Sequence, residues 1–288
     1  PCTARVMVSG VGGLSRPALP KIKGLDQFKG ALFHSADWQH DVTLQGKRVA
    51  VIGTGASAIQ FVPAIASEVG ELLLFQRTPA WIVPKPDGVI PTPIRKIFQY
   101  LPPAQRLARH AIYWQSEFFG IGFINPKLMA PISALAKSHL KRQVPNPQLR
   151  AKLTPNYTIG CKRVLFSNNY YPALTRDNVQ VLNTGVKEVT ADGVRDSQGQ
   201  LHAVDVIICG TGFDVQNPLG PLHVYGDDGL EIRQHGGLSA YMGINTRQMP
   251  NLFFLLGPNT ALGHNSIIFM IEAQVQYTLK CLAELDRK

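Results

Sequence analysis

Gly53, Gly55 and Ala58 form the clearest chemical pattern in the sequence. They directly follow the apolar run Arg48–Ile52. A GxGxxA turn between a strand and a helix lets a pyrophosphate approach the backbone and meet amide groups at the helix N-terminus. Gly53 would allow the tight turn, Gly55 the close approach and Ala58 the close packing of helix on strand. The pattern predicts a dinucleotide site, and a structural turn without a ligand is the alternative. Two further cofactor contacts are predicted, Ser57 in the same turn and Gln60 in the helix that follows.

The end of the next apolar run indicates which dinucleotide is bound. An NAD site places an acidic residue there, about 20 residues after the glycines, to hold the ribose 2′-hydroxyl. The sequence Phe75-Gln76-Arg77-Thr78 contains no acid. An arginine can bind a 2′-phosphate through two donors, and a threonine adds a hydroxyl. Arg77 and Thr78 therefore favour NADPH over NADH, although an arginine that is merely exposed at a strand end is the alternative.

These residues require a strand on each side of a helix. Arg48–Ile52 and Leu72–Phe75 are apolar enough to be buried strands, and a helix is expected between them up to about Ser67. Such a βαβ unit implies a parallel pair with a right-handed crossover. A kink is expected at Pro63, because proline lacks the amide that would bond to the Ile59 carbonyl.

The remaining elements are predicted from shorter patterns. The stretch Gln27–Gln39 is predicted to be irregular, and a hairpin turn is expected at 193–200. Further strands are expected at Arg5–Val8, Val179–Leu182, Val204–Cys209 and Leu252–Leu256. Helices are expected at Ile94–Tyr100, Ala104–Phe119 and Leu128–Gln143, within a helical insertion at 95–153, and at Ile267–Leu285.

The composition excludes several classes of protein. A chain of 288 residues with 45% hydrophobic and 17% charged residues is neither disordered nor collagen-like nor a coiled coil, and its length suggests two domains. The net charge is +10, but the basic residues are dispersed and no nucleic-acid motif accompanies them. We therefore expect solvated helical faces and no nucleic-acid partner.

Cysteine usage and hydropathy bear on the compartment. The four cysteines, Cys2, Cys161, Cys209 and Cys281, are scattered without a CxxC pair, which predicts no disulfide scaffold, no metal site and a cytoplasmic location. No signal peptide is expected, and no apolar run reaches the ~18–20 residues of a membrane span. The nearest run, Ala111–Leu135, contains polar residues and prolines. A half-buried helix is predicted there, and a substrate-entry or membrane-touching surface is the alternative.

The segment from Phe28 to Trp38 adds a longer pattern. On its own it indicates a packed surface loop with a hydrogen-bonded His34. Its spacing FxGxxxHxxxW, formed by Phe28, Gly30, His34 and Trp38, resembles the fingerprint of Baeyer–Villiger monooxygenases, part of the wider flavin-containing monooxygenase family. Trp38 favours the Baeyer–Villiger branch, because the related group usually has Tyr or Phe there. Gln39 departs from the usual Pro or Asp.

Other segments are similar to motifs of the same family, in the same order, over nearly the whole chain. They are Val8–Gly10 with Leu14–Pro17, the phosphate segment Phe75–Pro79, the Lys-Arg pair in Gly160–Arg163, the late strand and turn Asp205–Asp214, and the flavin-side strand and loop Asn251–Asn259.

The resemblance implies an α/β fold with two Rossmann-like dinucleotide-binding domains and a helical insertion. The FAD domain would be incomplete, because a second glycine fingerprint is absent. The implied boundaries are 1–40 for part of the FAD domain and the linker, 41–94 and 154–210 for the NADPH domain, 95–153 for the insertion and 211–288 for the C-terminal part of the FAD domain. We therefore expect the C-terminal part of a longer protein, unable to bind FAD tightly by itself.

The resemblance also implies the chemistry. NADPH would reduce FAD, and the reduced flavin would react with O2 to give a C4a-peroxyflavin that inserts oxygen into a ketone, yielding an ester or lactone. Arg163 would be the catalytic residue, stabilising developing negative charge, and Lys162 would join Arg77 at the 2′-phosphate. Gly212 and Asn259 would lie near the flavin, and His34 would anchor the hinge between domains. A solvated Lys162-Arg163 pair and a turn-forming Asn259 are the alternatives.

Three other functions are alternatives to this one. A related monooxygenase could oxidise soft nitrogen or sulfur instead of a ketone. A non-catalytic NADP-binding remnant would lack flavin. A flavin-dependent disulfide reductase would need a redox cysteine pair, which this sequence lacks, and the pattern at Phe28–Trp38 argues against it. The substrate is expected to be a small organic molecule used together with O2; the sequence does not predict the oligomeric state.

Overall fold

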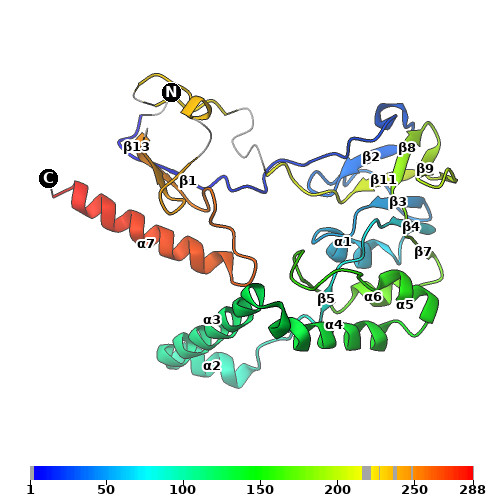
Figure 1. The fold of residues 1–288 in the computed structure, drawn as a ribbon, viewed down its shortest axis with the longest axis horizontal. Coiled ribbons are helices and arrows are strands. Elements are labelled where there is room, and N and C mark those ends of the chain that lie inside the picture. Colours follow the sequence, from blue (N-terminus) through cyan, green and yellow to red (C-terminus); the bar gives the residue numbers. More distant parts are fainter. Residues whose placement is uncertain (1–2, 216–221, 227, 236–238, 248, 288) are drawn as a thin grey trace. The chain divides into compact units, whose positions relative to one another are not determined.

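The chain forms two compact units in the computed structural model, which describes residues 3–215, 222–226, 228–235, 239–247 and 249–287 (Figure 1). Unit 1 comprises the described residues of Pro1–Arg16, Ile97–Gly120 and Phe213–Lys288, and unit 2 comprises Pro17–Lys96 and Ile121–Gly212. The predicted α/β class with a parallel sheet is confirmed. The assignment of segments to FAD and NADPH domains stays a prediction.

A five-stranded parallel sheet forms the centre of unit 2. Its spatial order is β2 (Ala31–His34), β11 (Val206–Cys209), β3 (Arg48–Ile52), β4 (Glu71–Phe75) and β7 (Val179–Leu182). The strands predicted at these places are confirmed, except that β11 is shorter than predicted and β2 was missed. Gln27–Gln39 was predicted to be irregular, and that is wrong. The four residues of β2 are too few to show a period, and their pairing with β11 joins segments far apart in sequence.

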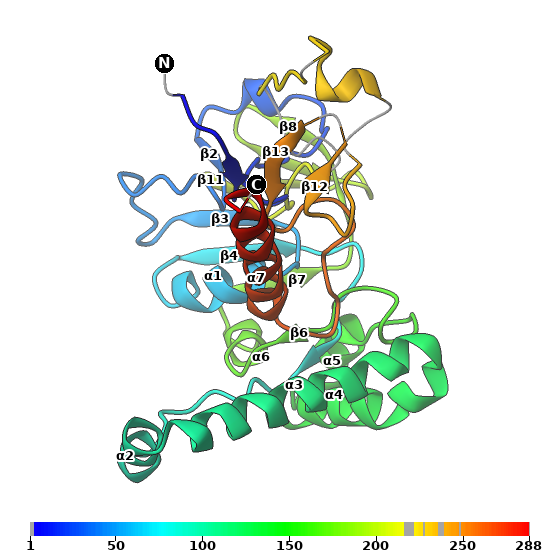
Figure 2. The same cartoon turned by 90° about the vertical axis from the view of Figure 1, so that its left-hand side faces the viewer.

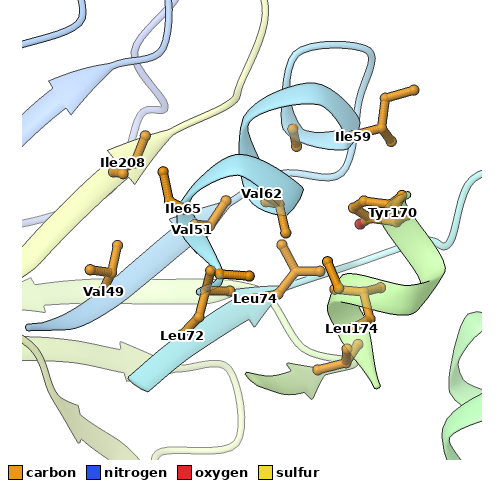
Figure 3. Packing of buried hydrophobic residues seen from close by; sticks show 14 of the residues in the cluster. Val49, Val51, Ile59, Val62, Ile65, Leu72, Leu74, Tyr170, Leu174 and Ile208 are labelled. Atoms are coloured by element: carbon orange, nitrogen blue, oxygen red, sulfur yellow. The ribbon is translucent and has the colours of Figure 1, made fainter. Parts of the chain in front are cut away.

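Both faces of this sheet are buried, and alternate residues serve opposite faces. Val49 and Val51 of β3 pack on one side with Leu72 and Leu74 of β4 (Figure 3). The residues between them, including Ala50 and Leu73, pack in a second cluster on the other side. The apolar runs seen in the sequence therefore reflect burial on two faces.

Helices cover the first face, and a small sheet covers the second. Ile59, Val62 and Ile65 of α1 (Ala58–Ile65) contribute to the first cluster together with α6 (Tyr170–Leu174) (Figure 3). Pro63 lies inside α1, which ends slightly before the predicted Ser67. The second face packs against three antiparallel strands, β8 (Val186–Thr190), β9 (Gly193–Asp196) and β10 (Leu201–Ala203). Leu25 of the short 3-10 helix η1 (Leu25–Gln27), which lies before β2 in the chain, packs against the same cluster. The hairpin predicted near 193–200 is confirmed.

Helices form at the three places predicted within 95–153; two are longer than predicted and the third begins two residues later, and the boundaries of an insertion stay a prediction. The helices of this region are α2 (Thr92–Tyr100), α3 (Pro102–Ile124), the 3-10 helix η2 (Pro126–Met129), α4 (Ala130–Gln143) and α5 (Pro147–Leu153). The region is framed by the parallel pair β5 (Ile82–Val83) and β6 (Leu165–Phe166). The side chain of Asn146 caps α5 by accepting the amides of Gln148 and Leu149.

Unit 1 has a three-stranded sheet in the order β1 (Met7–Ser9), β13 (Met249–Phe254) and β12 (Asn245–Thr246). The sheet is followed along the chain by the predicted C-terminal helix α7 (Ile267–Leu285), drawn in red in Figure 2. A 3-10 helix, η3 (Ile232–His235), contributes Ile232 to a small apolar cluster with β13. Among the described residues, no helix combines the length and apolarity that a bilayer crossing requires.

Substitution of Gly53 should be costly, because the backbone there combines a positive φ with a close neighbour. The φ of Gly53 is +110°, and a Cβ there would collide with the carbonyl oxygen of Gly210. We expect Gly53→Ala to lower the unfolding midpoint of unit 2 by about 5 °C or more, since both strain and a backbone clash must be relieved.

Gly55→Ala is the matched control, because a Cβ at Gly55 would meet no atom within 4 Å. Thermal unfolding followed by circular dichroism compares the two variants. Equal midpoints for both would contradict the expected strain at Gly53.

Candidate functional site

A pocket of about 730 Å³ opens in unit 2 where the parallel strands end. Ligands of open α/β sheets bind at this carboxyl edge. The pocket brings together six of the predicted site residues, Gly53, Gly55, Arg77, Thr78, Lys162 and Arg163. Further walls come from residues 18–22, Tyr157, Gly185, Val186, Gly210 and Thr211.

The glycine turn has the geometry that was predicted for it. Gly53 lies with positive φ against the end of β11, while a Cβ at Gly55 would point into open space. In the described part of the chain, the amides of Gly55, Ala56 and Ser57 have no hydrogen-bond acceptor. Ala58 is fully buried, 3.6 Å from where a Cβ on Gly210 would lie. The turn therefore offers unsatisfied N–H groups at a helix N-terminus, which suits a phosphate.

Two predicted contacts in this turn do not line the pocket. Ser57 occupies the N-cap position of α1 but makes no capping hydrogen bond with its side chain. The Gln60 side-chain amide donates to the Ala56 carbonyl at 2.8 Å. The Gln60 side chain therefore holds the backbone of the turn at Ala56. A contact of this side chain with a ligand stays a prediction.

Just after β4, the buried side chain of Gln76 is followed by the exposed side chain of Arg77. Gln76 is 2% exposed, and its side chain donates to the Lys152 carbonyl and to Asn183. Arg77 is exposed, and its aliphatic stem lies beside Gly185, where an added Cβ would be 3.5 Å away. The Thr54 hydroxyl, which sequence reasoning missed, donates to the Thr78 carbonyl at 3.4 Å. Arg77 is thus the residue of this strand end that is available to a ligand.

Lys162 and Arg163 reach the pocket from the loop before β6. The Trp81 indole donates to the Tyr157 carbonyl at 2.9 Å, which ties this loop to the chain just before β5. The Lys162 ammonium lies 4.9 Å from the centre of the Tyr157 ring, at cation–π distance. Burial raises the pKa of Tyr157, so its ring stays neutral under the ammonium.

The charges around the pocket all have one sign. Its lining contains four cations, Lys21, Arg77, Lys162 and Arg163, and no Asp or Glu. Sequence reasoning missed Lys21, because it follows a Gly- and Pro-rich loop whose path could not be predicted. Four cations around free amides are suited to a ligand with several phosphates. The described residues contain no group of three or more His, Cys, Asp or Glu able to hold a metal ion.

Three residues of the fingerprint pack the strand β2 and do not line the pocket. A Cβ on Gly30 would lie 2.8 Å from the Phe28 ring. Trp38 makes edge contacts with Phe33, at 5.3 Å between ring centres, and with Phe61 of α1, at 5.6 Å. Phe28 packs in the cluster on the opposite face of the sheet. These aromatic rings therefore hold β2 from both sides.

His34, at the end of β2, contacts the last residue of unit 2. It is 4% exposed, and its Nδ1 accepts the Ala36 amide at 3.1 Å. Burial lowers the pKa of His34, against the opposing effects of a hydrogen bond with the Gly212 backbone and of Asp37. Gly212 in turn accepts the Ala18 amide at 2.9 Å, close to where the chain enters unit 2. This position is compatible with a hinge anchor, which stays a prediction.

Gly212 and Asn259, both predicted to lie near a flavin, belong to different units. Gly212 has a φ of +85° and open space at its α-carbon. Asn259 of unit 1 is exposed with a φ of +60°, inside a turn in which the Thr260 hydroxyl donates to the Gly257 carbonyl. The turn-forming alternative for Asn259 is thus realised, and its contact with a flavin stays a prediction.

Comparisons with known proteins agree on one family. Residues 3–90 match the family model described as flavin-binding monooxygenase-like. The chain is 50% identical to a Baeyer-Villiger monooxygenase of Pseudomonas aeruginosa, over 99% of this chain and 55% of that protein. The chain spans about half the length of the curated relatives it matches.

Solved structures resemble the chain over its whole length. Cyclohexanone monooxygenase from Rhodococcus sp. Phi1 bound to NADP+ has a TM-score of 0.83 at 28% identity, covering 99% of this chain and 61% of that one. The OTEMO complex with FAD and NADP has a TM-score of 0.82 at 28% identity, covering 98% of this chain and 61% of that one.

The burial of His34 predicts an unusual titration. Its imidazole should lose its proton below pH 6.5, the ordinary value, because burial penalises the charged ring. As the folded pKa is lowered, the neutral ring favours folding above pH 6.5, and this stability declines as the unfolded chain takes up a proton at lower pH. NMR titration of the imidazole resonances, assigned with His34→Gln, measures this; a midpoint at or above 6.5 would contradict the burial argument.

Proposed function

We propose that this chain is part of a flavin-binding monooxygenase of the Baeyer–Villiger type, that it binds NADPH and that it takes part in the oxygenation of a ketone. The NADPH part is supported by the chain's own pocket. The monooxygenase part is supported by relatives of which this chain covers about half.

One observation carries the NADPH proposal: four cations converge on a glycine turn with free amides, and no carboxylate lines the pocket. NADPH carries a pyrophosphate and a 2′-phosphate. An acidic residue at the end of β4 would repel the 2′-phosphate of NADPH and would instead bind the free ribose 2′-hydroxyl of NADH. In this chain that place holds Gln76, whose side chain is already hydrogen-bonded inside the fold.

The residues divide the ligand's charges between them. The amides of Gly55, Ala56 and Ser57 suit the pyrophosphate, at the start of α1. Arg77 can bind the 2′-phosphate through two donors, with the Thr78 hydroxyl beside it. Lys162, held over Tyr157, adds a compact charge that can turn toward the same group.

Arg163 is proposed as the catalytic residue. It is exposed at the pocket, next to Lys162, and among the described residues it has no carboxylate partner. A guanidinium carries a positive charge and five N–H donors in a planar fork. An unpaired guanidinium can stabilise negative charge that develops on an oxygen during the reaction.

FAD is proposed as the second cofactor, since a structurally similar protein was solved with both FAD and NADP. When bound, FAD would accept hydride from NADPH and supply the reduced flavin that activates O2. The turn at Gly212 has open space beside its α-carbon, which would leave room for such a ligand. The ketone substrate is inferred from the name of the relative that shares half of the chain's residues.

We expect Arg77→Ala to weaken NADP+ binding about 10- to 100-fold, which is the effect of losing charge-assisted hydrogen bonds to one phosphate. Affinity for NAD+ should change less than twofold, because it lacks that phosphate. Isothermal titration calorimetry with both nucleotides measures the difference. Arg176→Ala, which removes an exposed arginine outside the pocket, is the control. An equal loss for both nucleotides would contradict the assignment of Arg77.

The reaction can be tested in a chimera in which this chain replaces the matching segment of the Pseudomonas aeruginosa relative. With FAD, NADPH, O2 and a panel of ketones, we expect esters or lactones, detected by mass spectrometry. Arg163→Ala should lower the turnover about 100-fold or more while NADP+ still binds. Sulfoxides or N-oxides without any ester would indicate the N- or S-oxidising function, and the absence of NADPH-dependent O2 uptake would indicate a non-catalytic NADP-binding module.

A further inference from the structure

One wall of the pocket is a short segment without regular structure, residues 18–23, which we call the strap. Both of its ends are bound within unit 2. At the first end, the Ala18 carbonyl accepts the Thr211 hydroxyl at 2.6 Å, just after β11. At the other end, the Lys23 carbonyl accepts the Val189 amide of β8 at 2.8 Å. The residues between these two anchors line the pocket, so the strap is a wall that is held in place from both sides.

Lys21 is the central residue of a tight turn in the strap. The Ile22 amide donates to the Pro20 carbonyl at 2.9 Å, which closes a three-residue turn around Lys21. The proline ring fixes the backbone before Lys21. After it, Ile22 packs against the apolar cluster on the second face of the sheet. The backbone of Lys21 is therefore held on both sides, while its exposed side chain has a flexible stem.

The two lysines at the end of the strap differ in their partners. The Lys23 ammonium lies 3.0 Å from the Glu188 carboxylate, and its hydrogen bond and charge lower the pKa of Glu188. Lys23 does not line the pocket. Lys21 does, and among the described residues its ammonium has no ion-pair partner. The strap thus neutralises one lysine with a carboxylate and leaves the other available to a ligand.

The pyrophosphate of the proposed ligand is the group that still needs a counter-charge. Each of its two phosphates is negative, and the glycine turn offers it only backbone amides, whereas Arg77 and Lys162 both suit the 2′-phosphate. The strap begins beside this turn, because Ala18 is bound just after β11, the strand whose end lies against Gly53. Lys21 follows three residues later. A compact ammonium on a flexible stem can pair with either phosphate, since it needs no fixed planar geometry.

We propose that Lys21 is a further dinucleotide-binding residue, whose ammonium pairs with the pyrophosphate bound at the glycine turn. This inference rests on the proposed binding of NADPH. It divides the cations of the pocket by task. Arg77 and Lys162 bind the 2′-phosphate, which distinguishes NADPH from NADH, and Lys21 binds the group that the two nucleotides share. Lys21 therefore contributes to affinity and leaves the choice between the nucleotides unchanged.

The test is titration of the 288-residue chain with three ligands, followed by NMR, which also measures weak binding. NADP+ carries both phosphate groups, NAD+ carries only the pyrophosphate, and 2′-AMP carries only the 2′-phosphate. We expect Lys21→Ala to weaken NADP+ and NAD+ about tenfold each, the effect of losing a charge-assisted contact, and to change 2′-AMP less than about twofold. Arg77→Ala should give the complementary pattern, with a loss for NADP+ and 2′-AMP and little change for NAD+.

Two further variants are the controls. Lys23→Ala removes the same charge two residues away and outside the pocket, so all three affinities should stay within about twofold of those of the unchanged chain. Lys21→Arg keeps the positive charge and should retain most of the affinity for NAD+. Both lysines are exposed, and circular dichroism confirms that the variants fold.

Several results would overturn the inference. A loss for NADP+ and 2′-AMP without a loss for NAD+ would place Lys21 at the 2′-phosphate instead. Unchanged affinities in Lys21→Ala, or an equal loss in Lys23→Ala, would show that Lys21 has no specific contact with the ligand. If the unchanged chain binds none of the three ligands, the proposed NADPH binding is wrong, and the role of Lys21 is wrong with it.

Discussion

The close approach of Gly53 to the carbonyl group of Gly210 is the constraint on which the site depends. It arises where β3 and β11, neighbours in the parallel sheet, both end. Neither strand can move aside, because both faces of the sheet are buried. Helices cover one face, and the small antiparallel sheet covers the other. The chain must therefore leave β3 with a positive φ, which glycine adopts without strain. After that exit, the amides of Gly55, Ala56 and Ser57 have no acceptor among the described residues, just before α1 begins.

The charges of unit 2 follow the direction of the same strands. At the amino ends of β3 and β11, Arg48 and Asp205 form a two-point ion pair at 2.7 and 3.2 Å, and this pair lowers the pKa of Asp205 to about 2. At the carboxyl ends, the pocket has cations and no acid. The cations there are held by other means. Lys162 lies over the Tyr157 ring, and the stem of Arg77 lies beside Gly185. Because no carboxylate has to be displaced, a polyanionic ligand gains the full interaction with each cation.

Sequence reasoning succeeded where the determining interactions are local. The turn at Gly53–Ala58 and the strands on either side of it follow from glycine geometry and from runs of apolar residues, which a sheet buried on both faces requires. It failed at β2, since four residues acquire strand geometry only by pairing with β11, more than 170 residues away. It failed at Lys21 for a related reason, because the path of a Gly- and Pro-rich loop is set by what it packs against. Thr54 could not be predicted because its hydroxyl donates to the Thr78 carbonyl in the loop after β4, a contact between loops 24 residues apart.

The fingerprint pattern shows that recognisable residues need not be reactive ones. Phe28 and Trp38 pack on opposite faces of the sheet, and Gly30 makes room for the Phe28 ring, so all three serve to seat β2. The strand they seat delivers His34 to the backbone of Gly212, where the chain leaves unit 2. A buried imidazole whose pKa is lowered is a poor general acid at neutral pH, because the ring is then neutral and lacks the extra proton of the imidazolium form. Its neutral ring is, however, a rigid hydrogen-bonding group. The pattern is therefore better explained by the need to hold one backbone segment at the edge of unit 2 than by any chemistry of its side chains.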